Sequence, residues 1–436
     1  MFYGYDVLVK RILIGDLRGH IDHEVLIQGW VDVRRDQGKM VFFNFRDRSG
    51  TVQGVVLPKS PAIETVKEIR NEYVVSVTGR VNKRPEKNIN PEMPNGDIEL
   101  EITAIEVFSA AEIPFERDAE VNIDTYLDHQ PYTLRSKEAQ SVFRVQATII
   151  EAYREALRKR GFVEFQTPAL VGSDAEGGAA AFKVDYYYEQ KAYLATSPQF
   201  YKQIMVGVFE RAFSTSKVFR GEKHATTRHL SEYSTLDFEM GFIQDHTDVM
   251  ATLEEVMRHI AKRVPEGEAR MPEKIPVLTL REVQKTLGVS LDEPDLEPEH
   301  ERLICEWALK EHGSDFLFVT HYPMSKRPFY TYEDENNLGY SKSFDLLFRG
   351  LEISTGGQRV HRYDELVKRL EAHGMDPALF SFYLETFKVG MPPHGGSAVG
   401  LERLTARMLN LPNIKEATLF PRDMNRIDTL LNNNNE

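Results

Sequence analysis

The sequence predicts an α+β protein in which a five-stranded β-barrel of the OB type precedes a larger domain of strands and helices. Five short segments rich in β-branched residues precede residue 108, and one short helix interrupts them before the fourth. A long helical segment begins near residue 137, and irregularly alternating strands and helices follow it. The chain contains neither G-x-G-x-x-G nor G-x-x-x-x-G-K-[ST], so neither a dinucleotide fold nor a P-loop is indicated.

Turn residues separate the predicted barrel strands. Asp36-Gln37-Gly38 follows the first strand, and Ser49-Gly50 follows the second. In the fifth strand, apolar residues alternate with glutamates, as in a strand exposed on one side. We expect strands at 25–35, 40–46, 51–57, 73–81 and 98–102, and a helix at 61–71. Such barrels commonly bind oligonucleotides, although any small five-stranded barrel would show this pattern.

The remainder divides at residue 136. The stretch 109–135 contains two prolines and little periodicity, which predicts a hinge. Ser136 can cap a helix over 137–160, because a serine side chain accepts a hydrogen bond from a first-turn amide. Gly161 suits the end of that helix. The expected domains are 1–108, a hinge at 109–135, and 136–436.

Composition excludes several classes of protein. No segment approaches the roughly 20 consecutive apolar residues of a membrane helix, and the first residues do not resemble a signal peptide. The single cysteine, Cys305, excludes an internal disulfide and a cysteine-based zinc site. We therefore expect a cytoplasmic protein with no membrane partner. The net charge of −13 argues against indiscriminate nucleic-acid binding.

The charge is unevenly distributed. Residues 1–108 carry 15 basic and 16 acidic side chains, so the acidic excess lies in the rest of the chain. Basic and aromatic residues gather between residues 30 and 48: Arg34, Arg35, Lys39, Arg46 and Arg48, with Trp30, Phe42, Phe43 and Phe45. Cations beside rings suit single-stranded nucleic acid, but a solvated charged face has the same composition.

A first candidate site is a hairpin that contains Phe219-Arg220-Gly221-Glu222 and continues through residues 235–240. Residues two apart on a strand share a face, so Arg220 lies with Glu222 and Asp237 with Glu239. The basic loop residues are Lys223, His224, Arg228 and His229. This arrangement is a candidate phosphate clamp, and a surface hairpin with ordinary ion pairs is the alternative.

A second candidate site is a hairpin that turns at Arg349-Gly350. This turn sets Leu347 opposite Glu352 and places Asp345, Glu352 and Ser354 on one face. Two converging carboxylates suit Mg²⁺ bound to a triphosphate, although a solvated acidic strand is the alternative. Glycines before Leu401 then permit close backbone approach to a ligand, and Arg403 lies in the first turn of the next predicted helix.

These segments resemble the three motifs of the class II aminoacyl-tRNA synthetases. The first motif matches 161–168, whose proline lies at the dimer interface in that family; the second matches 219–239, and the third matches 400–403. The resemblance covers about residues 25–423 and implies an antiparallel β-sheet flanked by helices, ATP as substrate, Mg²⁺ and a homodimer. The barrel would then bind the anticodon of a tRNA.

Finer features resemble the aspartyl branch. Ser197-Pro198-Gln199 precedes Lys202, residues 174–178 resemble a mobile loop, and Phe420-Pro421-Arg422-Asp423 matches the aspartyl ending. Only about a hundred residues separate the second motif from Asp345, so the large insertion of typical bacterial enzymes is absent. The catalytic part looks archaeal-like, and the barrel loop at 84–91 looks bacterial, which suggests a compact type found in some bacteria.

The resemblance assigns roles to individual residues. Arg220 would hold the α-phosphate and Arg403 the γ-phosphate, with Glu352 as the third catalytic residue. The aspartate-binding set would be Glu176, Gln199, Lys202, Asp237, Thr355 and Arg359. The ATP-binding set would be Arg220, Glu222, Arg228, His229, Leu230, Glu352, Gly400, Leu401, Glu402 and Arg403. Asp345, Glu352 and Thr355 would hold Mg²⁺, and Arg34, Arg35, Phe42, Arg48 and Gln53 would contact the anticodon.

The predicted reaction joins L-aspartate to tRNA-Asp through an aspartyl-adenylate. Lys202 and Arg359 would select aspartate, because neutral asparagine would leave two buried cations unpaired. Three alternatives remain open: an asparaginyl-tRNA synthetase, a tRNA-independent amide-forming ligase, and an inactive RNA-binding regulator with the OB fold. Charging of tRNA-Asn in addition to tRNA-Asp also remains open, and Asp32 stands where relatives carry tryptophan or histidine.

Overall fold

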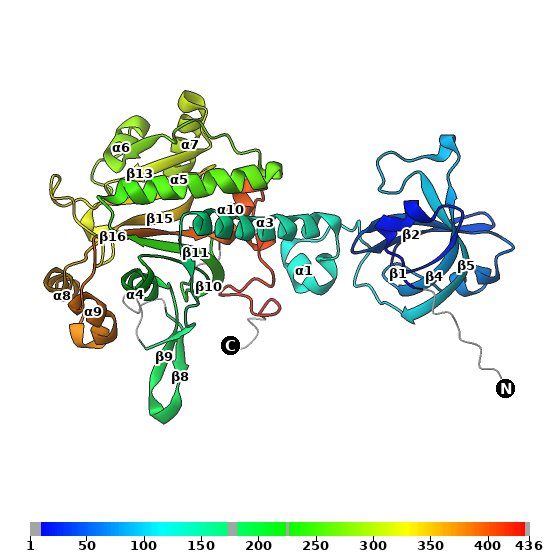
Figure 1. The fold of residues 1–436 in the computed structure, drawn as a ribbon, viewed down its shortest axis with the longest axis horizontal. Helices are drawn as coiled ribbons and strands as arrows, with labels where there is room; N and C mark the ends of the chain where they lie inside the picture. The colour runs from blue at the N-terminus through cyan, green and yellow to red at the C-terminus, as the bar shows by residue number, and fades with distance from the viewer. Residues whose placement is uncertain (1–9, 173–180, 224–225, 432–436) are drawn as a thin grey trace. The chain divides into compact units, whose positions relative to one another are not determined.

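The computed structural model describes residues 10–172, 181–223 and 226–431. The chain separates into two compact units, Met1–Glu120 and Val121–Glu436. Figure 1 shows the barrel of the first unit and the large sheet of the second. No helix among the described residues is both long and apolar enough to cross a membrane.

The first unit is a closed five-stranded barrel, as predicted. Its strands have the order β1-β2-β3-β5-β4, in which β3 and β5 pair in parallel and the other pairs are antiparallel. They are β1 (Glu24–Gln37), β2 (Met40–Asp47), β3 (Gly50–Val56), β4 (Val74–Lys83) and β5 (Ile98–Ser109). Alternate residues of β2, such as Phe43 and Phe45, fill the core, so Phe42 and Asn44 lie on the outer face.

The helix expected at 61–71 is wrong. Two 3-10 turns, Pro61–Ile63 and Thr65–Lys67, occupy this segment. Three β-branched residues in four positions, Ile63, Thr65 and Val66, weaken an α-helix there. The segment still buries Ala62 and Val66 of the turns, and Ile69 after them, against the barrel, so tertiary packing determines its conformation.

The second unit contains an eight-stranded sheet with the order β12-β13-β14-β15-β16-β11-β10-β6. Its central pairs are antiparallel, and only the β12–β13 and β10–β6 pairs are parallel. The strands are β6 (Val163–Glu164), β10 (Arg211–Phe219), β11 (Glu232–Gly241), β12 (Val277–Thr279), β13 (Phe316–Thr320), β14 (Ser343–Phe348), β15 (Leu351–Arg359) and β16 (His394–Gly400). A smaller sheet pairs β9 (Lys191–Leu194) with β7 (Leu170–Val171) and β8 (Lys183–Asp185).

Helices cover the large sheet unequally. α3 (Lys137–Lys159), α5 (His246–Arg263) and α10 (Leu401–Met408) share one apolar core with β10, β11 and β13–β16. The helix expected at 137–160 is confirmed, and the Ser136 side chain accepts from the amide of Ala139. α6 (Leu280–Leu287) and α7 (Pro298–His312) pack against the alternate residues of β13 and β14, which face the other side.

Three further helices frame the uncovered part of that second face. α4 (Gln199–Phe209) packs through Phe200 into a separate apolar cluster with α8 (Tyr363–Ala372) and α9 (Ser381–Lys388). The predicted hinge contains two short helices, α1 (Ile123–Asp128) and α2 (Gln130–Thr133), both in the second unit. The hinge role and the boundary at residue 108 stay predictions.

Candidate active site

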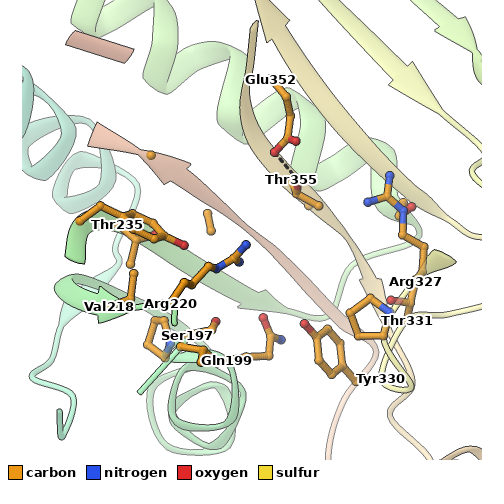
Figure 2. A pocket seen from close by; sticks show the side chains of 18 of the residues that line it. Ser197, Gln199, Val218, Arg220, Thr235, Arg327, Tyr330, Thr331, Glu352 and Thr355 are labelled. Atoms are coloured by element: carbon orange, nitrogen blue, oxygen red, sulfur yellow. Dashed lines mark hydrogen bonds between the residues drawn. The ribbon is translucent and has the colours of Figure 1, made fainter. Parts of the chain in front are cut away.

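A cavity of about 620 Å³ lies on this second face of the sheet, in the size range of small-molecule sites. Its walls come from α4, the β10–β11 hairpin, β15, the junction of β16 with α10, and the segment 325–331. Figure 2 shows Arg220, Glu352, Thr355 and Gln199 around this space. The residue types, mostly charged and polar, suit a charged ligand.

Most predicted site residues line the cavity. They are Gln199, Lys202, Arg220, Glu222, Arg228, His229, Leu230, Glu352, Thr355, Arg359, Gly400, Glu402 and Arg403. Asp237, Asp345 and Leu401 are absent from the lining: Asp237 contacts Lys202, Asp345 contacts Arg327, and Leu401 packs in the apolar core. Glu176, the loop at 174–178 and His224 lie outside the described residues.

One end of the cavity contains a buried cluster of four charges. Lys202 Nζ lies 3.0 Å from Asp237 Oδ1 and 3.4 Å from Glu239 Oε2. Arg359 Nε donates to Glu239 Oε1 at 2.9 Å, and its Nη2 donates to the carbonyl of Gly396 at 2.9 Å. Burial alone would raise the pKa of Glu239, but Arg359 and Lys202 hold it below its usual value.

This cluster corrects one sequence-based argument. Lys202 and Arg359 are already paired without a substrate, because Asp237 neutralises Lys202 and Glu239 neutralises Arg359. Sequence reasoning noted that Asp237 and Glu239 share a face of β11 but gave Glu239 no role. The resemblance assigned Asp237 to the site, and its shared strand face with Glu239 was the signal that could have placed Glu239 there too.

The other end of the cavity presents partly exposed cations. The side chains of Arg220 and Arg403 are 37% and 30% exposed, which leaves both guanidinium groups accessible to a ligand. Arg220 directly follows β10 rather than lying within it, and its guanidinium lies 5.8 Å from the Tyr233 ring. Arg403 Nη1 donates to the carbonyl of Glu352 at 3.0 Å. Arg228 pairs with Glu301 of α7.

A β-bulge changes the predicted register of the β14–β15 hairpin. Leu347 pairs with Glu352 as expected, but the register then shifts, so Asp345 pairs with Thr355 rather than Ser354. One extra residue in β15 puts Glu352 and Thr355 on the same side. The Thr355 hydroxyl donates to Glu352 Oε1 at 3.0 Å, as Figure 2 shows.

These residues fit a hard divalent cation. Asp345 Oδ2 accepts from Arg327 at 2.9 Å, whereas its Oδ1 is buried with no hydrogen-bond partner among the described residues. Burial raises the pKa of Asp345. Limited solvent contact would raise the pKa of Glu352 too, but Arg403 lowers it. Across the described part of the chain, His, Cys, Asp and Glu nowhere gather in a metal-binding group of three or more, so a ligand such as a phosphate would supply further oxygens.

The outer face of the barrel brings Arg35, Phe42, Asn44 and Gln53 together. Arg35 pairs with Phe42 across β1 and β2, and Asn44 pairs with Gln53 across β2 and β3. Arg35 Nη2 donates to Asn44 Oδ1 at 3.2 Å and to Gln53 Oε1 at 3.4 Å. A ring, an amide and a cation thus share one surface, which suits an unstacked base beside its phosphate.

The other predicted barrel cations lie in different surroundings. Arg34 Nη1 donates to the carbonyls of Val66 and Ile69 at 2.8 and 2.6 Å, so it ties the 3-10 turns to β1. Arg46 pairs with Asp32 at 3.2 Å and with Glu72 at 2.5 Å. Arg48 is exposed at the turn between β2 and β3.

Comparisons with known proteins identify the family of each domain. Residues 122–424 match the family described as tRNA synthetases class II (D, K and N), and residues 25–108 match the OB-fold nucleic acid binding domain. The chain is 45% identical to the aspartate–tRNA(Asp/Asn) ligase of Thermus thermophilus, over 96% of this chain and 99% of that protein. The chain belongs to the aspartyl-tRNA synthetases. It is thus an aminoacyl-tRNA synthetase, a family of ATP-dependent tRNA ligases.

Other relatives place this synthetase within its family. It is 37% identical to the aspartate–tRNA(Asp/Asn) ligase of Archaeoglobus fulgidus, over 96% of this chain and 99% of that protein. A solved asparaginyl-tRNA synthetase from Pyrococcus horikoshii has a TM-score of 0.87 at 30% identity, covering 96% of this chain and all of that one. Because these lengths agree closely, the prediction of a compact synthetase without a large insertion is confirmed.

Proposed function

We propose that this synthetase activates L-aspartate with ATP and transfers the aspartyl group to tRNA-Asp. The observation that carries the proposal is the buried Lys202–Asp237–Glu239–Arg359 cluster at one end of a cavity whose other end presents Arg220 and Arg403. An amino acid with a second carboxylate fits the first end, and a triphosphate fits the second. The names of the similar ligases support the same substrate.

Catalysis is by positioning and charge stabilisation. An oxygen of the aspartate α-carboxylate attacks the α-phosphorus of ATP, and pyrophosphate leaves. Arg220 stabilises the charge that develops on the α-phosphate, and Arg403 binds the γ-phosphate. No base on the protein is required, because the attacking carboxylate is already ionised. A terminal ribose hydroxyl of tRNA then attacks the acyl carbon, and AMP leaves.

Magnesium would bind through Glu352 and the unpartnered Oδ1 of Asp345, with Thr355 beside Glu352. When bound there, the ion supplies positive charge to the oxygens of the triphosphate. Arg327 already pairs with the second oxygen of Asp345, so this arginine fixes the direction of the first.

We propose that aspartate is selected by a cluster whose positive and negative charges are equal in number, rather than by unpaired cations. The two cations and two carboxylates carry no formal net charge. The Arg359 guanidinium has five N–H groups, and its Nε and Nη2 are used by Glu239 and Gly396. The remaining N–H donors of Arg359 suit a carboxylate, which only accepts hydrogen bonds. The NH₂ group of asparagine is itself a donor, so it could not accept from them.

On the barrel, we propose that Phe42 stacks on an anticodon base, that Gln53 reads it, and that Arg35 and Arg48 contact phosphates. The resemblance also predicts an anticodon contact for Arg34, but its side chain binds backbone carbonyls of the barrel itself. We also propose a cytoplasmic homodimer formed around Pro168, where Val163 and Leu170 are apolar and exposed. The second tRNA named for several relatives, tRNA-Asn, is proposed here as an additional substrate.

ATP–pyrophosphate exchange tests the proposal. Exchange that depends on aspartate and not on asparagine is expected, and exchange with asparagine alone would instead indicate an asparaginyl enzyme. Charging of purified tRNA-Asp and tRNA-Asn then measures tRNA specificity. Exchange without charging of either tRNA would favour the tRNA-independent ligase, and no exchange with either amino acid would favour the inactive regulator.

A further inference from the structure

Beside the amino-acid end of the cavity, buried polar side chains form a hydrogen-bonded chain that leads away from the ligand. Gln199, on the first turn of α4, donates through Nε2 to Gln203 Oε1 at 3.0 Å. The Tyr383 hydroxyl donates to the same oxygen at 2.9 Å. Gln203 Nε2 lies 2.8 Å from His394 Nε2. Gln203 is fully buried, and it does not line the cavity.

The carbonyl of Pro392 determines which groups donate and which accept along this series of hydrogen bonds. His394 Nδ1 lies 2.9 Å from that oxygen, which can only accept, so Nδ1 carries a proton. Burial lowers the pKa of His394 to about 4, so the ring is neutral and its Nε2 accepts. Gln203 must therefore turn its NH₂ group to His394 and its oxygen to Tyr383 and Gln199.

This order determines what Gln199 can offer to a ligand. Gln199 uses its NH₂ group on Gln203, so its remaining polar atom is the carboxamide oxygen. Figure 2 shows the Gln199 side chain extending from α4 toward the cavity. We propose that Gln203 is a positioning residue that holds the Gln199 carboxamide with its oxygen toward the α-ammonium of the amino acid. This inference rests on the proposed function, with Gln199 of the predicted aspartate-binding set taken as the acceptor of that ammonium.

The variant Gln203→Met keeps the volume and removes the three polar contacts of Gln203, with Gln199, Tyr383 and His394. Gln199 can then turn its NH₂ group toward the ammonium, which replaces an attraction by a repulsion. We expect the KM for aspartate in the exchange reaction to rise about tenfold and the KM for ATP to stay within twofold. Tyr383→Phe is the matched control: it removes the other donor to the same oxygen and should leave both constants within twofold.

A ligand-side test separates positioning from general damage to the site. Two adenylate analogues with a sulfamate in place of the acyl phosphate, one carrying and one lacking the α-amino group, are titrated calorimetrically. In Gln203→Met, affinity for the amino analogue should fall about tenfold, and affinity for the analogue without it should stay within twofold. Equal losses for both analogues would overturn the inference.

A double variant provides the remaining check. Gln203→Met added to Gln199→Ala should cause no further loss of aspartate affinity if Gln203 acts through Gln199, and an additive loss would contradict this. If Gln203→Met does not fold, the shorter Gln203→Asn replaces it. Its side chain cannot reach Gln199 and His394 at once, so affinity for the amino analogue alone should again fall. Wild-type protein without aspartate-dependent exchange refutes the proposed function; the binding titrations, which need no turnover, decide the role of Gln203 separately.

Discussion

The position of Arg359 in the cavity requires the guanidinium geometry of an arginine. It is buried, bound to Glu239 and the Gly396 carbonyl, and stands 5.5 Å from the Tyr330 ring. A lysine keeps the charge but loses the planar fork that can serve three oxygens at once. Substitutions here should therefore act on the amino acid and not on the nucleotide.

We predict that Arg359→Lys raises the KM for aspartate about 100-fold in ATP–pyrophosphate exchange and leaves the KM for ATP nearly unchanged. Arg362→Lys, three residues later and exposed, is the matched control and should behave as wild type. An equal rise in both constants for Arg359→Lys would show that the cluster supports the whole cavity rather than the amino acid alone.

The barrel arginines should divide into two classes. Arg35→Met and Arg48→Met should each weaken tRNA binding and reduce its salt dependence by about one counterion, while adenylate formation stays unchanged. Arg34→Met removes the same charge but mainly loses hydrogen bonds to the 3-10 turns, so it should lower the urea midpoint instead. If only Arg34→Met reduced the salt dependence of tRNA binding, Arg34 rather than Arg35 or Arg48 would be the phosphate contact.

At the scale of elements, the C-terminal segment is held to α1 by one buried arginine. The Arg426 side chain is 1% exposed and pairs with Asp124 at 3.0 Å and with Asp128. Nearby Arg422 pairs at 2.8 Å with Asp428, whose side chain is 85% exposed. The two arginines thus offer a buried and an exposed ion pair in one short stretch.

We predict that Arg426→Met lowers the free energy of unfolding by about 2–3 kcal/mol, because two carboxylates lose their partner and the segment loses its anchor. Arg422→Met should change it by no more than about 0.5 kcal/mol. Urea denaturation of both variants measures the difference, and equal effects would mean that Arg426 is not the anchor.

Elements with strong local signals were predictable from the sequence. Ser136 begins α3 where its side chain can cap, and alternating residues define the barrel strands. Features that depend on distant partners were not. The bulge in β15, the ion pairs of Arg46 with Asp32 and Glu72, and the 3-10 turns under Arg34 each need the folded barrel or sheet to form.

The same limit applies to the site. Most of the motif residues lie in the cavity lining, but sequence spacing could not show that Glu239 already neutralises Arg359, nor that Gln203 connects Gln199 to His394. Asp32 is explained by its surroundings: it is buried in an ion-paired cluster within the first unit.

For the molecule as a whole, two buried neutral histidines predict an acid-labile fold. Burial lowers the pKa of both His246 and His394 to about 4, below the value of about 6.5 expected when unfolded. Between these values the unfolded chain binds more protons, so stability is full above about pH 6.5 and falls as pH drops toward 4.

Urea midpoints measured at about pH 7 and about pH 5 should show this loss, with a slope of up to about 1.4 kcal/mol per pH unit for each histidine. His246→Leu should remove about half of that dependence. A midpoint that does not change between the two pH values would contradict the assignment of neutral rings.

The ion pairs of Arg117 indicate where the polypeptide can be cut after the barrel without loss of barrel contacts. Although β5 ends at Ser109, Arg117 Nη1 reaches back to Asp32 at 2.6 Å and its Nη2 contacts Glu72. A gene truncated at codon 109 would remove the Arg117 ion pair from both acids, whereas one extended to codon 120 would retain it. Limited proteolysis should accordingly release a barrel fragment that includes Arg117.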